Sequence, residues 1–293
     1  MRIARAGPSP RARRNLGWLA LGLTVAAAVP GGPASAQDSA MARLGTGTVA
    51  GATALANEVN NPTAPITLLQ LRNVISMPLT DSTGTGNLLQ LQFVLPIAKG
   101  KLIPLAQLTR TTLPFIWLPG PGSDAGFGDL EFFDIGLIPA KWGRWGFGVS
   151  MVFPTASSTT LGQGKWQLGP ALGLIMTSVP NLQFGLVLQN PISFAGASDR
   201  PSVNALSISP TLTYNFHGGW FAGYSDFEWN FNWETGGTAT IPLGIQIGKV
   251  VKLGKRHFVF SAEGGKFLAR AGNQSPDWVI GIEAAWVVRA LTH

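Results

Sequence analysis

The sequence predicts an all-β fold: a transmembrane, antiparallel, up-and-down β-barrel of about 12 strands, with a short N-terminal helix or plug segment before it. Three observations predict this class. Strand-like segments follow one another from residue 66 with no helical segment between them. They are about twice as long as strands of soluble domains. The connections between them alternate between short or basic ones and flexible, often acidic ones.

Residues 1–36 are predicted to be a secretory signal peptide. Five arginines precede an apolar run from Leu16 to Val29, which is followed by the small-residue sequence Ala34-Ser35-Ala36. We expect cleavage after Ala36 and export to the outer membrane of a Gram-negative bacterium. The alternative is an uncleaved anchor, although a membrane span needs roughly 20 residues and this run is shorter.

The composition excludes several function classes. Removing the five N-terminal arginines from 21 basic residues leaves 16 against 14 acidic ones, so the high net charge does not indicate a nucleic-acid partner. The 12% of charged residues and 37 glycines are atypical of disordered chains and helical bundles. There is no cysteine, the three histidines are scattered, and we expect neither a cofactor nor a metal site.

Residues 37–65 are predicted to be an N-terminal periplasmic or lumenal segment. A short helix is expected over 52–60, ended by Pro62, and the segment is a candidate partial plug of the lumen. Residues 66–293 are assigned to the barrel. Its predicted strands cover 66–78, 88–97, 106–118, 127–138, 144–154, 165–176, 181–190, 203–216, 219–232, 239–249, 257–267 and 277–288.

The stretch RWGFGVSMVF (144–153) shows the period of two that predicts which face each residue takes. Its large residues, from Trp145 to Phe153, are expected to face lipid. Gly148 is expected to face the lumen and to tolerate a serine. Phe227, at the head of a similar run, is assigned to lipid too. Asp134 falls on an apolar face beside Phe132, which a bulge or strand end nearby would correct, although the sequence shows none.

Strand length separates a membrane barrel from a secreted soluble β-protein, the main alternative. Eleven residues at roughly 3.3 Å each, tilted near 45°, span about 25 Å, the height of a bilayer's apolar band. Most tryptophans lie towards strand ends, where the aromatic girdles of barrels occur.

Strand parity places a set of polar residues inside the barrel as candidates for lumen lining or selectivity. They are Arg72, Arg110, Asp129, Glu131, Tyr224, Asp226, Glu228, Glu263 and Glu283. Charges are costly on the lipid face, which supports the inward assignment. Two readings stay open: structural arginine–carboxylate pairs that fill the lumen, or a constriction that selects solutes.

Five stretches resemble, in order, a family of outer-membrane proteins associated with the meta-pathway of phenol degradation, also known as transporter or neuromedin-U-like bacterial proteins. They are ALANEVNNPTAPITLLQL (54–71), LTRTTLPFI (108–116), GFGDLEFFD (126–134), FPTASSTTLGQGKWQLGPALG (153–173) and ATIPLGIQIGKVVKLGK (239–255). The resemblance covers nearly all of the mature chain. It implies a porin-like barrel that passes small, hydrophobic or aromatic, solutes.

The leading functional expectation is therefore an outer-membrane channel or transporter for small solutes, and not an enzyme. A structural barrel with a packed lumen and a lipid-facing hydrolase are the alternatives; the three histidines lie in a glycine turn, at a strand start and at the terminus. Expected partners are outer-membrane lipid and lipopolysaccharide, small-molecule solutes and the barrel assembly machinery.

Overall fold

A computed structural model describes residues 49–61, 64, 66–79, 84–101, 103–120, 123–270 and 276–288. The predicted signal peptide and its cleavage site lie outside these residues. The first described element is the helix α2 (Val49–Val59), in agreement with the helix expected over 52–60. No helix in the described ranges is long and apolar enough to cross a membrane.

Fifteen β-segments follow α2. The first eight are β1 (Thr67–Leu79), β2 (Gly86–Ile97), β3 (Ala106–Leu118), β4 (Asp124–Phe127), β5 (Leu130–Ala140), β6 (Gly143–Phe153), β7 (Lys165–Met176) and β8 (Leu182–Gln189). The remaining seven are β9 (Ile192–Gly196), β10 (Ala205–Asn215), β11 (Trp220–Tyr224), β12 (Trp229–Asn232), β13 (Thr238–Leu253), β14 (Arg256–Ala269) and β15 (Pro276–Val288). Short 3-10 turns, η1 (His217–Gly219) and η2 (Trp233–Thr235), precede β11 and β13.

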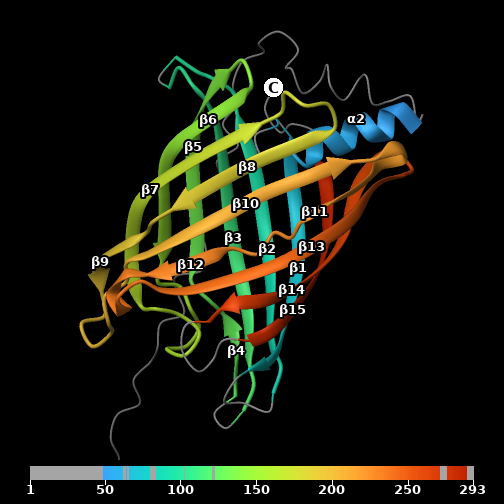
Figure 1. Cartoon of the computed structure of the whole chain (residues 1–293). Coiled ribbons are helices and arrows are strands. Elements are labelled where there is room, and N and C mark those ends of the chain that lie inside the picture. Colours follow the sequence, from blue (N-terminus) through green and yellow to red (C-terminus); the bar gives the residue numbers. More distant parts are fainter. Residues whose placement is uncertain are drawn as a thin grey trace, which may run out of the picture. The chain divides into compact units, whose positions relative to one another are not determined.

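The segments form one antiparallel sheet that closes on itself (Figure 1). Pairing runs from β10 through β12, β13, β14 and β15 to β1, then on to β8, which pairs with β10 again. The wall has twelve positions, called barrel strands below, and three of them consist of two segments: β4 with β5, β8 with β9, and β11 with β12. The closed barrel leaves no free edge, and the predicted fold class is confirmed.

In the stretch 144–153, the side chains point to the faces of the barrel wall that the period of two predicts. Trp145, Phe147 and Val149 on β6 are exposed on the outer face of the wall. Ser150 is buried on the inner face and Gly146 lines the lumen. Six tryptophans are likewise exposed at strand ends, as a pair of girdles requires: Trp117, Trp145, Trp166, Trp220, Trp233 and Trp278. Lys249 lies over the ring of Trp220 and Lys266 over that of Trp278.

Gly148 corrects one expectation, because a serine does not fit there. A Cβ added at Gly148 would lie 1.9 Å from the carbonyl oxygen of Asp134 on the adjacent β5. At Gly173 on β7, also on the lumenal side, the nearest atom to an added Cβ is 3.7 Å away. Gly148 is therefore required for the close approach of two strands, whereas a Cβ at Gly173 would make only ordinary van der Waals contact.

Asp134 stays on the outer face. The interruption of the fourth barrel strand falls at residues 128–129, before Phe132, and Phe133 and Ile135 on either side of Asp134 are buried on the inner face. This interruption of the strand therefore does not turn Asp134 inward. Instead, Gln107 on β3 donates a hydrogen bond from Nε2 to Oδ2 of Asp134 (2.9 Å), so one oxygen of the carboxylate is hydrogen-bonded to the adjacent strand.

The helix α2 lies against the inner wall at one end of the barrel, called the helix end; the opposite end is the loop end. Leu55 and Ala56 are almost completely buried, in one cluster with Phe221, Val250 and Val259 of the wall. Four asparagines hold the helix: Asn57 donates to Asn181 (2.9 Å) and accepts from Asn215 (2.9 Å), and Asn60 also donates to Asn215 (2.6 Å). Both hydrophobic packing and amide hydrogen bonds thus hold α2 in the barrel.

We expect Gly148→Ala to destabilise the barrel by about 1–3 kcal/mol, since the added methyl group forces β5 and β6 apart. Gly173→Ala is the matched control and should be neutral. The midpoint of urea unfolding in detergent, followed by the faster migration of folded barrel on unheated SDS gels, measures both. Equal midpoints for the two variants would contradict the close-approach explanation.

Candidate functional site

Among the described residues, two cavities inside the barrel share part of their walls. The cavity on the helix-end side has a volume of about 450 Å³, and α2 residues Glu58 and Val59 line one side of it. The cavity on the loop-end side has a volume of about 350 Å³, and residues of the β6–β7 connection line it. The shared residues, called the junction below, are Leu88, Gln90, Arg110, Thr112, Glu131, Phe133, Glu228 and Asn230.

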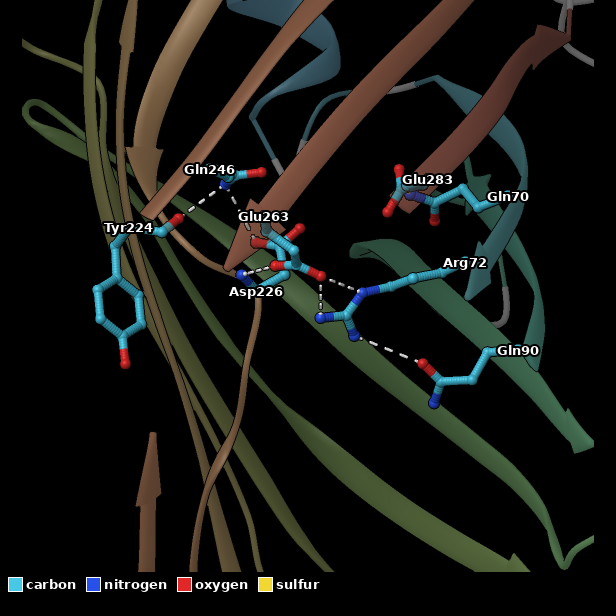
Figure 2. Close-up of polar contacts among 8 residues, drawn as sticks. All are labelled: Gln70, Arg72, Gln90, Tyr224, Asp226, Gln246, Glu263 and Glu283. Atoms are coloured by element: carbon cyan, nitrogen blue, oxygen red, sulfur yellow. Dashed lines mark hydrogen bonds and ion pairs between the residues drawn. The ribbon is translucent and has the colours of Figure 1, made fainter. Parts of the chain in front are cut away.

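A buried ion pair between β1 and β14 is the central polar contact of the larger cavity (Figure 2). Arg72 donates from Nε (2.8 Å) and Nη2 (2.5 Å) to Oε1 of Glu263, and from Nη1 to Gln90 (3.4 Å). Both side chains of the pair are nearly inaccessible, at 11% and 6% exposure. A buried charge needs a partner and saturated hydrogen bonds, and this arrangement supplies both.

The ninth barrel strand bends into the lumen between β11 and β12. Along this break, the backbone N–H of Asp226 donates to Oε2 of Glu263 (2.9 Å), and Ser225 N donates to Gly244 O (3.2 Å). Phe227 is buried inside the barrel, with the Arg72 guanidinium 5.3 Å from its ring centroid. The assignment of Phe227 to lipid is therefore wrong, because the irregular segment interrupts the period of two.

Tyr224 is a second residue whose face the break changes. It pairs with Ile245, which is 76% exposed on the outer face, and its ring points away from the Arg72 network in Figure 2. Only its backbone carbonyl contacts the interior, where it accepts from Gln246 Nε2 (2.8 Å). Parity counted back from Asp226 placed the Tyr224 side chain in the lumen; the structure places it outside.

The outer side of the break is closed by two aromatic side chains. Pro242 on β13 lies between two residues that pair with the ninth barrel strand, Ile245 with Tyr224 and Thr240 with Asn230. Because that strand leaves the wall here, no backbone N–H of the strand reaches the Pro242 carbonyl. It accepts instead from Tyr224 Oη (2.5 Å) and Trp229 Nε1 (3.1 Å). These side chains replace missing backbone donors on a surface where backbone groups must be paired within the protein.

The junction carries the second polar group. Arg110 Nη2 lies 3.7 Å from Glu228 Oε1, and its guanidinium lies 4.7 Å from the ring centroid of Phe133. Ser207 and Ser209 on β10 also donate to the Glu228 carboxylate, at 2.5 and 3.2 Å. Glu131 lines both cavities and is exposed within them.

The other two predicted lumenal acids have different surroundings. Glu283 lines the larger cavity and accepts from Gln70 Nε2 (3.1 Å). Asp129 lies nearer the loop end, where its carboxylate accepts from the backbone N–H groups of Ala156 (3.1 Å) and Gln163 (2.7 Å). Asp129 therefore fixes the β6–β7 connection over the smaller cavity.

The structure brings Arg72, Glu263, Asp226 and Glu283 together beside the larger cavity, and Arg110, Glu131 and Glu228 together at the junction. The candidate set did not include the lumenal aromatic Phe133, although the parity that places Glu131 inward places Phe133 inward too, and parity assigned Phe227 to lipid. The adjacent pair Phe132–Phe133 carried a signal for the first, because neighbouring residues of a strand face opposite sides. Nothing in the sequence marked the second. No cluster of three or more potential metal ligands occurs among the residues that the structure describes.

No protein-family model and no curated protein matches the sequence. Solved structures do match. An outer-membrane channel from Pseudomonas putida F1 aligns with a TM-score of 0.55 and 12% identity, over 76% of this chain and 96% of that chain. The NanC porin aligns with a TM-score of 0.50 and 9% identity, over 75% of this chain and 98% of that chain. These similarities show that the fold is that of outer-membrane β-barrels.

Removal of either partner of the Arg72–Glu263 pair should destabilise the protein. We expect Arg72→Met and Glu263→Gln each to lower the free energy of unfolding by about 3–5 kcal/mol, because each leaves a buried group without its partner. The double variant should lose less than the sum of the two. Urea unfolding in detergent provides the measurement; strictly additive losses would show that the two side chains do not interact.

Proposed function

We propose that the protein is an outer-membrane channel for small solutes. The observation that carries the proposal is the pair of cavities joined at the junction, which together extend from α2 to the β6–β7 connection. The barrel fold shared with an outer-membrane channel and a porin supports it. Exposed apolar residues and tryptophans on the outer face suit contact with lipid and lipopolysaccharide.

The finer resemblance, to the family associated with phenol degradation, adds the proposal that the solutes include hydrophobic or aromatic molecules. Apolar side chains in the larger cavity support this: Val74, Phe133, Phe227 and Val279 all line it. Export by a signal peptide cleaved after Ala36, and insertion by the barrel assembly machinery, remain predictions from the sequence. So does the absence of enzymatic activity.

The helix α2 is proposed to restrict passage at the helix end. It lines the larger cavity, and its attachment depends on Asn57, which bonds both Asn181 and Asn215. Because these are bonds between neutral amides, their loss weakens the attachment of the helix without leaving an unpaired charge in the wall. The competing proposal of a packed structural lumen predicts that weakening the attachment of the helix leaves the single-channel current unchanged.

Single-channel recording in planar bilayers tests the function. We expect small currents from the full-length protein and larger or more frequently open currents from Asn57→Ala. Asn204→Ala is the control, since it removes an asparagine–asparagine bond (2.8 Å, to Asn190) away from α2. Swelling of liposomes with sugars, amino acids and phenolics then ranks the solutes. The absence of current and of swelling in all three proteins would favour the packed-lumen alternative.

A further inference from the structure

We propose that the junction makes the channel selective for cations, so that small solutes carrying a positively charged nitrogen group pass in preference to anions. This inference rests on the proposed channel function and names the solute class. Its basis is the balance and arrangement of charged side chains around the two cavities, and in particular the position of Glu131.

Acidic residues outnumber basic ones in the lining of the cavities. Six carboxylates face three guanidinium groups, and no lysine contributes to the lining. Glu263 stands behind this lining, where it takes two hydrogen bonds from Arg72 and thereby neutralises that arginine. An excess of one sign of charge inside a narrow, low-dielectric wall concentrates ions of the opposite sign.

The junction shows the same imbalance at the place that a solute passing between the cavities must cross. Its charged groups are Glu131, Glu228 and Arg110. Arg110 is held against the wall, with its guanidinium beside the Phe133 ring and one nitrogen 3.7 Å from Glu228. The positive charge is thus directed at a carboxylate that already accepts from two serines.

Glu131 is the carboxylate left to face a solute. It lies on β5 between the two cavities, exposed to both, and no hydrogen bond or ion pair engages its side chain within the described part of the chain. A carboxylate at the shared wall of two cavities attracts a cation and repels an anion, and the surrounding low dielectric strengthens both effects. Glu131 is therefore the specificity-determining residue of the junction.

The test is the zero-current potential of the full-length protein in planar bilayers under a tenfold gradient of KCl, followed by the same measurement with tetramethylammonium chloride. We expect both cations to be more permeant than chloride. Glu131→Gln should lower the cation-to-chloride permeability ratio by about three- to tenfold, and Arg110→Gln should raise it. Glu234→Gln, in the η2 turn at the loop end outside the cavity lining, is the matched control and should leave the ratio unchanged.

Two outcomes overturn the inference while the channel function stands: a wild-type channel that prefers chloride, or a ratio that Glu131→Gln changes no more than Glu234→Gln. Faster migration on unheated SDS gels verifies that each variant is folded before it is recorded. Glu131→Lys is an independent test, since it places a positive charge at the junction and should make the channel prefer chloride over cations. A wild-type protein without any current refutes the channel function itself, and is thereby distinguished from a failure of selectivity.

Discussion

The need to pair every backbone N–H and C=O group where no water is available is the constraint on which the rest of this structure depends. The β8–β10 ladder meets it by closing the sheet, so that no edge strand remains. The break in the ninth barrel strand tests the constraint most severely, because residues 225–228 leave the wall. There, the side chains of Tyr224 and Trp229 donate to the Pro242 carbonyl in place of the missing backbone N–H groups. The carbonyl therefore keeps hydrogen-bond donors even where the regular strand pairing is interrupted.

Closure creates a second problem, because the inner face of the barrel holds charges in a confined space. The inward break contributes to its solution. It brings the backbone N–H of Asp226 to the second oxygen of Glu263, whose first oxygen already accepts from Arg72. The same movement places the Phe227 ring beside the guanidinium. A local departure from regular strand geometry thus completes the hydrogen bonding of the most deeply buried ion pair.

These relations explain why the sequence predicts some features and not others. The period of two is a property of any regular strand, so the number and order of barrel strands and the faces of Trp145, Phe147 and Val149 follow from it. The inward placement of Arg72, Arg110, Glu131 and Glu263 follows as well. The prediction fails where the backbone leaves the regular path, since parity then counts residues that no longer alternate. Tyr224 is the last residue before the irregular segment, and Phe227 lies within it.

Other features were not predicted because they depend on contacts between strands, about which strand parity gives no information. The requirement for Gly148 arises from the position of the Asp134 carbonyl on the neighbouring strand, and the outward Asp134 is accommodated by Gln107, 27 positions earlier. Likewise, the asparagines that hold α2 come from positions more than 120 residues apart. Such pairings depend on register and chain closure, which a single sequence does not reveal.

The two polar attachments inside the barrel differ in strength, and the difference bears on which part of the lumen moves. Separating Arg72 from Glu263 exposes two charges to a poor solvent and costs several kcal/mol, roughly 3–5. An amide–amide hydrogen bond of the kind that holds α2 contributes only about 0.5–1.5 kcal/mol net, because in the unfolded chain both amides bond to water instead. Burial of Leu55 and Ala56 adds to the attachment of the helix but involves no charge. Release of α2 therefore breaks several neutral contacts and exposes no charge, whereas separation of Arg72 from Glu263 exposes two charges in the wall.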